Sequence, residues 1–125
     1  MDFQLALETH LGAIKGRILK DLSKSIPQDG DIAYILPNGE VIGSAAELRE
    51  YFTEWFSEDQ WKINHKILFT ETSEEMAYAV VEAEYNDVDE DGPYELTYLS
   101  TLIFRLIESK WILVSSQSTE IEEED

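Results

Sequence analysis

The chain has 125 residues, of which 43% are hydrophobic, including 3 Trp, 6 Tyr and 5 Phe. This is enough apolar surface to build the core of one domain. Its 27 acidic and 9 basic side chains give a formal net charge of −18, which disfavours nucleic acid and anionic membranes as partners because both require clustered basic residues. The lack of cysteine excludes disulfides, thiolate metal sites and a cysteine nucleophile.

The sequence also indicates where the protein resides. No apolar run approaches the ~20 residues that a membrane-spanning helix needs. The first ten residues, MDFQLALETH, lack the basic start and the small-residue cleavage site of a secretory signal. We therefore expect a cytoplasmic protein.

The first segment is predicted to be an amphipathic helix. Asp2 can cap its start, and Pro27 and Gly30 indicate that a loop follows it. Its apolar residues recur at spacings of three and four and form one stripe, which consists of Phe3, Leu7, Leu11, Ile14, Ile18 and Leu22.

A short hairpin and a second helix are predicted next. Asn38-Gly39 lies between two apolar runs, which is the strongest short-range hairpin signal. Ser44 and Glu47 form a capping box, in which the Ser44 hydroxyl accepts from the Glu47 N–H and the Glu47 carboxylate accepts from the Ser44 N–H. The helix that follows carries the most aromatic face of the chain, with Leu48, Tyr51, Phe52, Trp55 and Phe56.

Alternating apolar and polar residues predict four consecutive strands in the second half of the chain, at residues 61–70, 76–87, 94–106 and 111–119. Residues 120–125 carry five carboxylates in six positions, and we expect them to form a solvated acidic tail. The predicted organisation is therefore one domain over residues 1–119, followed by this tail.

The order of helix, hairpin, helix and four linked strands predicts an α+β fold with an antiparallel sheet. Leu99 and Ile103 are apolar residues on the expected outer face of their strand, and Ile112 and Val114 make the last strand apolar on both faces. A sheet with one solvated face should alternate cleanly. A second copy of the chain covering the outer face is the simplest explanation, and a monomer with scattered surface aliphatic residues is the alternative.

Several segments together resemble the nuclear-transport-factor-2-like superfamily, in particular its SnoaL-like branch. The resemblance covers nearly the whole chain. It indicates the fold more than the chemistry, because the matching segments contain no catalytic signature. The segments that carry it are His10-Leu11-Gly12-Ala13-Ile14, Leu36-Pro37-Asn38-Gly39 with Gly43-Ser44 and Trp55-Phe56, then Thr101-Leu102-Ile103-Phe104-Arg105, Trp111-Ile112-Leu113-Val114, Gln117 and Thr119.

The resemblance implies a cone-shaped, curved antiparallel β-sheet wrapped around the N-terminal and second helices, a cystatin-like roll. It also implies an apolar pocket inside the cone and a homodimer formed through the outer face of the sheet. We expect the pocket to bind a small apolar molecule. The residues expected to line it are Tyr51, Trp55, His65, Tyr98, Ser100 and Gln117.

Three of these residues have competing interpretations. The Tyr98 hydroxyl either binds a carbonyl or hydroxyl group of a ligand or lies at the rim of an aromatic core. His65 shares an apolar strand face with Trp61, Ile63, Ile67 and Phe69, so it is either a general base or ligand donor or a core histidine bonded to a neighbour. Gln117 stands where relatives often carry a histidine or another polar pocket residue. An amide orients a ligand but is a poor base, and a purely structural hydrogen bond is its alternative role.

Three functions remain open on the sequence. The first is a domain that binds a small apolar molecule without catalysis. The second is an isomerase or cyclase with His65 as base and Tyr98 as hydrogen-bond donor, although no Asp or Glu is embedded in an apolar strand face as such chemistry needs. The third is a structural dimerisation domain whose vestigial pocket is filled by its own side chains.

We predict neither a metal nor a cofactor. Asp87-Val88-Asp89-Glu90-Asp91-Gly92 matches the start of a calcium-binding EF-hand loop. The bidentate Glu that should close such a loop at its twelfth position is replaced by Tyr98, so a solvated hairpin turn is the favoured interpretation. His10 and His65 lack metal-ligand spacing, and the chain has no glycine-rich phosphate loop.

Overall fold

The structure, a computed structural model, describes residues 2–121. Its helices are α1 (Phe3–Gly16), α2 (Leu19–Leu22), the 3-10 turn η1 (Ser23–Ser25) and α3 (Ala45–Phe56). Its strands are β1 (Asp31–Ile35), β2 (Val41–Ser44), β3 (Lys62–Thr72), β4 (Met76–Asp89), β5 (Gly92–Ile107) and β6 (Lys110–Glu120).

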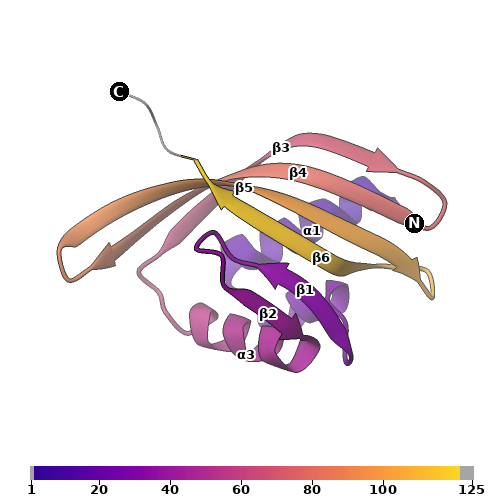
Figure 1. Cartoon of the computed structure of the whole chain (residues 1–125), viewed down its shortest axis with the longest axis horizontal. Helices are drawn as coiled ribbons and strands as arrows, with labels where there is room; N and C mark the ends of the chain where they lie inside the picture. Colours follow the sequence, from indigo (N-terminus) through magenta and orange to yellow (C-terminus); the bar gives the residue numbers. More distant parts are fainter. Residues whose placement is uncertain (1, 122–125) are drawn as a thin grey trace.

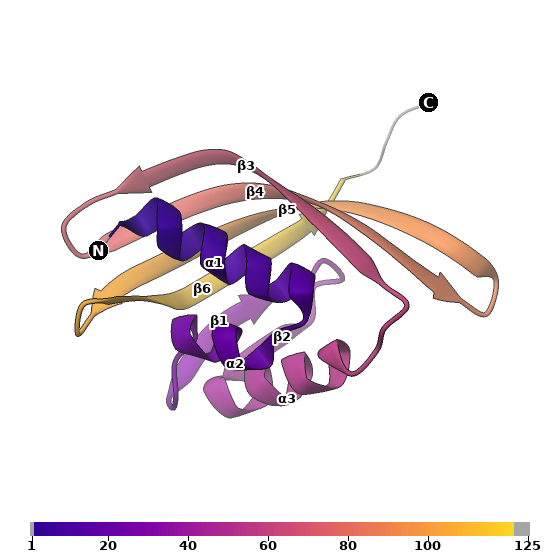
Figure 2. The same ribbon diagram turned by 180° about the vertical axis from the view of Figure 1, so that it is seen from behind.

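The six strands form one curved sheet in the order β2-β1-β6-β5-β4-β3. Figure 1 shows the sheet from its outer side, and Figure 2 shows α1 lying along its concave side with α3 near the β1–β2 hairpin. The predicted α+β roll is therefore confirmed. One pairing was not predicted, because β1 runs parallel to β6, with Tyr34 opposite Ser116. Within residues 2–121, no helix has both the length and the apolar character that crossing a bilayer would require.

The first predicted helix is divided at Arg17. Asp2 caps its start as expected, accepting from the Gln4 N–H at 3.0 Å. Arg17 adopts a left-handed conformation, with φ 56°, and the Ile18 N–H donates to the Ala13 carbonyl at 2.9 Å, which closes the helix in a Schellman motif. Ile18 is therefore 45% exposed, and its predicted place on the buried stripe was wrong.

The turn at Arg17 positions its guanidinium against the second half of the chain. The Arg17 guanidinium carbon lies 4.1 Å from the centroid of the Trp61 ring, and the guanidinium also donates to the Trp61 carbonyl oxygen. Trp61 is fully buried and stacks on Trp55, with ring centroids 4.3 Å apart. These contacts join the end of α1 to α3 and to the start of β3.

The predicted hairpin and helix cap both form. Gly39 has φ 88°, and its N–H donates to the Leu36 carbonyl at 2.9 Å, so a residue without a Cβ is favoured there. The Ser44 hydroxyl accepts from the Glu47 N–H at 3.2 Å. The Glu47 carboxylate accepts from the Gly43 N–H at 3.4 Å, one residue earlier than predicted.

A bulge in β3 changes which side chains face the core. Ile67 pairs with Val81 and Phe69 pairs with Val80, so Leu68 is an extra residue in β3. Because side chains alternate along a strand, one extra residue reverses the alternation. Phe69 is consequently 66% exposed, and its predicted place on the apolar face of His65 was wrong.

A second bulge lies in β6. Ile103 pairs with Ser115 and Phe104 pairs with Leu113, which leaves Val114 without an opposite residue. Leu113 and Ser116 are therefore both buried. The strand continues to Glu120, one residue beyond its predicted end and into the predicted tail. The Ile121 N–H donates to the Thr97 carbonyl at 2.9 Å. The rest of the predicted tail, 122–125, lies outside the described residues, and the domain organisation stays a prediction.

Candidate functional site

A cavity of about 460 Å³, partly open to solvent, lies inside the roll. Pockets for small molecules usually have about 300–1,000 Å³. Its inner wall is made by buried residues of α1 and the central strands, namely His10, Leu11, Ile14, Val81, Ser100, Leu102 and Ser116. Its mouth is formed by exposed residues of the hairpin and of β5 and β6, namely Asn38, Glu40, Tyr94 and Glu120.

The structure brings five of the six predicted pocket residues to this cavity, namely Tyr51, Trp55, His65, Tyr98 and Ser100. Strand register explains why His65 and Tyr98 share it. His65 pairs with Ala83, and Ala83 pairs with Tyr98, so one row across the sheet carries two large polar side chains with a methyl group between them. Both side chains can therefore reach one ligand above Ala83.

Gln117 does not line the cavity, and its expected position in the pocket was wrong. It pairs with Thr101, and both residues are exposed. The bulge at Val114 reverses the alternation of β6, so the cavity receives the side chains on either side of Gln117. These are Ser116 and Ser118.

Several lining residues were missed by the sequence reasoning. His10 lies three residues after Leu7 on the buried stripe of the first helix, and this spacing is a signal that could have found it. Tyr34 reaches the cavity because β1 pairs with β6, which is a long-range contact without a local signal. Ser116, Ser118 and Glu120 depend on the bulge in β6.

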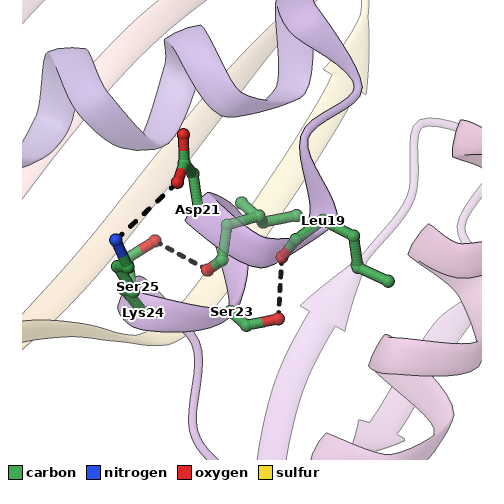
Figure 3. A network of polar contacts seen from close by, with 6 residues as sticks. Leu19, Asp21, Ser23, Lys24 and Ser25 are labelled. Carbon is green, nitrogen blue, oxygen red and sulfur yellow. Dashed lines mark hydrogen bonds and ion pairs between the residues drawn. The ribbon is translucent and has the colours of Figure 1, made fainter.

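His10 is held as a neutral donor at the bottom of the site. The Ser25 hydroxyl donates to the Leu22 carbonyl at 3.1 Å, within the polar contacts of α2 and η1 shown in Figure 3. That hydroxyl has a single proton, so in its 2.7 Å contact with His10 Nδ1 it accepts and Nδ1 donates. Burial, assisted by His65, lowers the pKa of His10 to about 3.

His65 is also neutral at physiological pH. Burial is the main cause that lowers its pKa to about 4, and the positive charge of Lys15 contributes. An effective general base has a pKa near the operating pH. His65 and Tyr98 both line the cavity, but this low pKa makes His65 a weak base near pH 7.

Three tyrosine hydroxyls gather in the cavity. Burial raises the pKa of Tyr34, Tyr51 and Tyr98, and Tyr51 lies close enough to Tyr34 and Tyr98 to raise the pKa of both further. For Tyr51 the value reaches about 12, with the Glu40 carboxylate as a further cause. All three therefore remain protonated and can each donate and accept a hydrogen bond. Among residues 2–121, no side chain or backbone group is hydrogen-bonded to these hydroxyls.

Five aromatic rings form a continuous belt along the cavity wall, which we call the aromatic belt. Its members are Tyr34, Tyr51, Trp55, Tyr85 and Tyr94, and successive ring centroids lie 6.3, 5.8, 6.1 and 6.4 Å apart. The Tyr85 hydroxyl accepts from the Trp55 indole N–H at 3.4 Å and donates to the Asp87 carboxylate at 2.6 Å. These bonds fix the orientation of the central rings.

The acidic segment before β5 forms a turn, as favoured by the sequence. The Asp91 N–H donates to the Asp89 carboxylate at 2.8 Å, and Gly92 has φ 110°. Across residues 2–121, no group of three or more His, Asp or Glu side chains is arranged to hold a metal ion.

Comparison with solved structures relates this architecture to known proteins. No protein-family model and no curated protein matches the chain. A ketosteroid isomerase-like protein from Erwinia carotovora atroseptica matches with a TM-score of 0.77 and 14% identity over 96% of this chain and 94% of that chain. An NTF2-like protein of unknown function in nutrient uptake from Rhodospirillum rubrum matches with a TM-score of 0.76 and 20% identity. The match covers 98% of this chain and 100% of that chain. The chain has an NTF2-like fold.

A third structure extends the range of roles found on this fold. The CaMKII hub from S. rosetta matches with a TM-score of 0.76 and 13% identity, over 95% of this chain and 94% of that chain. These identities support a shared fold but do not transfer a function, because one fold hosts many activities. The function of this NTF2-like chain must therefore be argued from its own cavity and surface.

Proposed function

We propose that the protein binds one small, largely apolar molecule in the cavity. The observation that carries this proposal is an open space of about 460 Å³ lined by aromatic rings and by tyrosine hydroxyls that have no hydrogen-bond partner within residues 2–121. Within residues 2–121 the only buried side-chain polar atom without a partner is the Arg17 Nε, so the tyrosine hydroxyls are accessible from the cavity and free to bond to a molecule in it. A ligand that contacts the rings with its apolar body and the hydroxyls with a polar atom would satisfy both features.

Binding without catalysis is favoured over an isomerase or cyclase. Among residues 2–121, the carboxylates that line the cavity are those of Glu40 and Glu120, and both are exposed at its mouth. His65 has a pKa of about 4. Glu40, Glu120 and His65 therefore supply neither a buried carboxylate nor a base whose pKa is near neutral pH. A vestigial pocket is disfavoured because the described side chains leave the cavity unfilled.

The test is a thermal-shift screen of hydrophobic metabolites with a matched pair of variants. Ser116 lines the cavity and is 1% exposed, whereas its neighbour Gln117 lies on the outer face. We expect Ser116→Phe to fill part of the cavity, to remain folded and to lose the response to ligands, and Gln117→Phe to keep it. In the wild type, a ligand at about 100 times its Kd should add ~2.7 kcal/mol to the free energy of unfolding.

Two outcomes would contradict this proposal. One is a complete screen at high concentration that stabilises the wild type with no compound. The other is a compound that stabilises Ser116→Phe as strongly as the wild type, because its binding site would then lie outside the cavity.

We also propose that two copies associate through the outer face of the sheet. Register brings the apolar residues of this face together, since Phe69 pairs with Val80 and Tyr78 pairs with Ile103. Phe69 is 66% exposed and Tyr78 is 40% exposed. Leu99 lies two residues before Thr101, the β5 partner of Val80, and so faces the same side of the sheet. A structure named as a calcium/calmodulin-dependent protein kinase type II association domain, from Thiobacillus denitrificans, has the same fold. Exposed apolar patches of this kind commonly mark interfaces.

The oligomeric state should respond to charge on this face. We expect a dimer by analytical ultracentrifugation at about 100 μM, and we expect the double variant Phe69→Glu with Ile103→Glu to be a folded monomer. Because each copy carries a net charge of −18, added salt should strengthen association by screening the repulsion. The control Val88→Glu removes a 48% exposed apolar residue from the far end of β4 and should remain dimeric. A monomeric wild type at this concentration would contradict the proposal.

A further inference from the structure

The polar groups of the cavity are distributed unevenly along one row of the sheet. His65, Ala83, Tyr98 and Glu120 lie side by side on β3, β4, β5 and β6. Neighbouring strands are about 4.8 Å apart, so the two ends of the row are about 14 Å apart. Lys15 lies near His65 at one end, and the Glu120 carboxylate lies at the other. The row therefore becomes more negative toward β6.

The negative end of this row coincides with the mouth of the cavity. Glu40, from the hairpin, lies near enough to the Tyr51 hydroxyl to raise its pKa, and both Glu40 and Glu120 line the cavity. Within residues 2–121, no lysine or arginine lines it. An anionic ligand would meet two uncompensated carboxylates here and would be repelled.

The aromatic belt has one end, Tyr94, at the same mouth. A cation is attracted to the face of an aromatic ring within about 6 Å of its centroid, and Trp and Tyr are the best such rings. Three belt members, Tyr34, Tyr51 and Trp55, stand in sequence, and Tyr51 is the ring whose hydroxyl lies near Glu40. Aromatic rings and carboxylates, two independent features, thus line the same cavity, and both favour positive charge in a ligand.

We propose that the cavity selects molecules with an apolar body and one cationic nitrogen, a protonated amine or a quaternary ammonium group. The nitrogen lies at the mouth, between the Glu40 and Glu120 carboxylates and the aromatic belt, and the apolar body lies against Leu11, Ile14 and Leu102. This inference rests on the proposed binding function and names its ligand class.

Two probes of the same shape test the inference. Benzyltrimethylammonium and neopentylbenzene differ only in having a charged nitrogen or a neutral carbon at one position. We expect the cation to bind the wild type at least about tenfold more tightly than the neutral probe, measured by calorimetry. The NMR signal of the Trp55 indole N–H reports whether each probe occupies the cavity. Phenylacetate, an anion of similar size, should bind more weakly than either.

Charge variants test whether the preference for a cation comes from the two cavity carboxylates or from the negative charge of the whole protein. We expect Glu40→Gln with Glu120→Gln to lower the affinity for the cation about tenfold and to leave the neutral probe unchanged. Both residues use backbone groups for their hydrogen bonds in the hairpin and sheet, so the fold should tolerate the change. The control Glu74→Gln with Glu84→Gln removes two exposed carboxylates outside the cavity and should keep the preference.

The outcomes distinguish this inference from the proposed function. Equal or tighter binding of the neutral probe in the cavity would overturn the cationic ligand class and support the binding function. Failure of both probes to bind, with other compounds stabilising the protein through the cavity, would overturn the inference alone. Failure of every compound would overturn both. A preference for the cation that persists in Glu40→Gln with Glu120→Gln would also overturn the inference.

Discussion

Replacing Phe104 with alanine is expected to lower the free energy of unfolding by about 3–5 kcal/mol, the usual range for a buried Phe→Ala change. Phe104 is fully buried and lies at the centre of the contact between α1 and β5. Its ring centroid is 5.3 Å from that of Phe3 and 5.4 Å from that of His10, both edge to face. Removing the ring leaves a hole that the rigid sheet cannot close.

Urea denaturation followed by circular dichroism measures this loss. The control is Ile107→Ala, on the same strand, where the isoleucine side chain is 43% exposed. This change should lower the free energy of unfolding by less than about 1 kcal/mol. Phe104→Leu should fall between the two and remains measurable if the alanine variant does not fold. Equal losses for Phe104→Ala and Ile107→Ala would show that α1 does not pack on the sheet as described.

Stability should fall on mild acidification because of the buried histidines. The pKa of His10 is lowered from 6.5 to about 3 by burial, and that of His65 to about 4. The unfolded chain therefore takes up protons below pH 6.5 that the folded protein does not. The stabilisation is fully present above pH 6.5 and is lost progressively down to about pH 4 for His65 and about pH 3 for His10.

Below pH 6.5, each histidine should lower the free energy of unfolding by about 1.4 kcal/mol per pH unit. Acidification from pH 6.5 to pH 5 should therefore remove about 2 kcal/mol of stability through His10 alone. The window from pH 7 to pH 5 lies above the ordinary titration range of carboxyl groups. The variant His10→Asn retains an N–H that can donate to Ser25 but has no group that titrates in this range. Its unfolding should take up one proton fewer than that of the wild type, so its free energy of unfolding should depend less steeply on pH. His65→Gln should keep the slope of His10. An identical pH dependence for wild type and His10→Asn would contradict the neutral, buried state of His10.

Much of the fold was predictable because its signals are local. The stripe of the first helix, Asn38-Gly39 and the capping box at Ser44 each specify a structure within a few residues. The helix end at Arg17 was missed, since its left-handed conformation accompanies the contact of its guanidinium with Trp61, 44 positions away.

The candidate site was predictable where strand alternation holds and failed where it is interrupted. Tyr98 and Ser100 lie on β5, whose pairing with β4 is uninterrupted, and they face the cavity as predicted. Gln117 follows the bulge in β6 and faces outward. A bulge depends on how two strands fit together, so neither strand alone reveals it. Tyr34 likewise depends on the pairing of β1 with β6, which no short segment encodes.

Electron density inside the roll is the most direct evidence for or against a ligand-binding role. The measurement is a crystal structure of the protein grown with the compound that stabilises it most. The expected result is density for that compound among Tyr51, Trp55 and Tyr98, with its polar atom within hydrogen-bond distance of a tyrosine hydroxyl. A compound seated on the outer face, or a cavity closed by the protein's own side chains, would contradict the account.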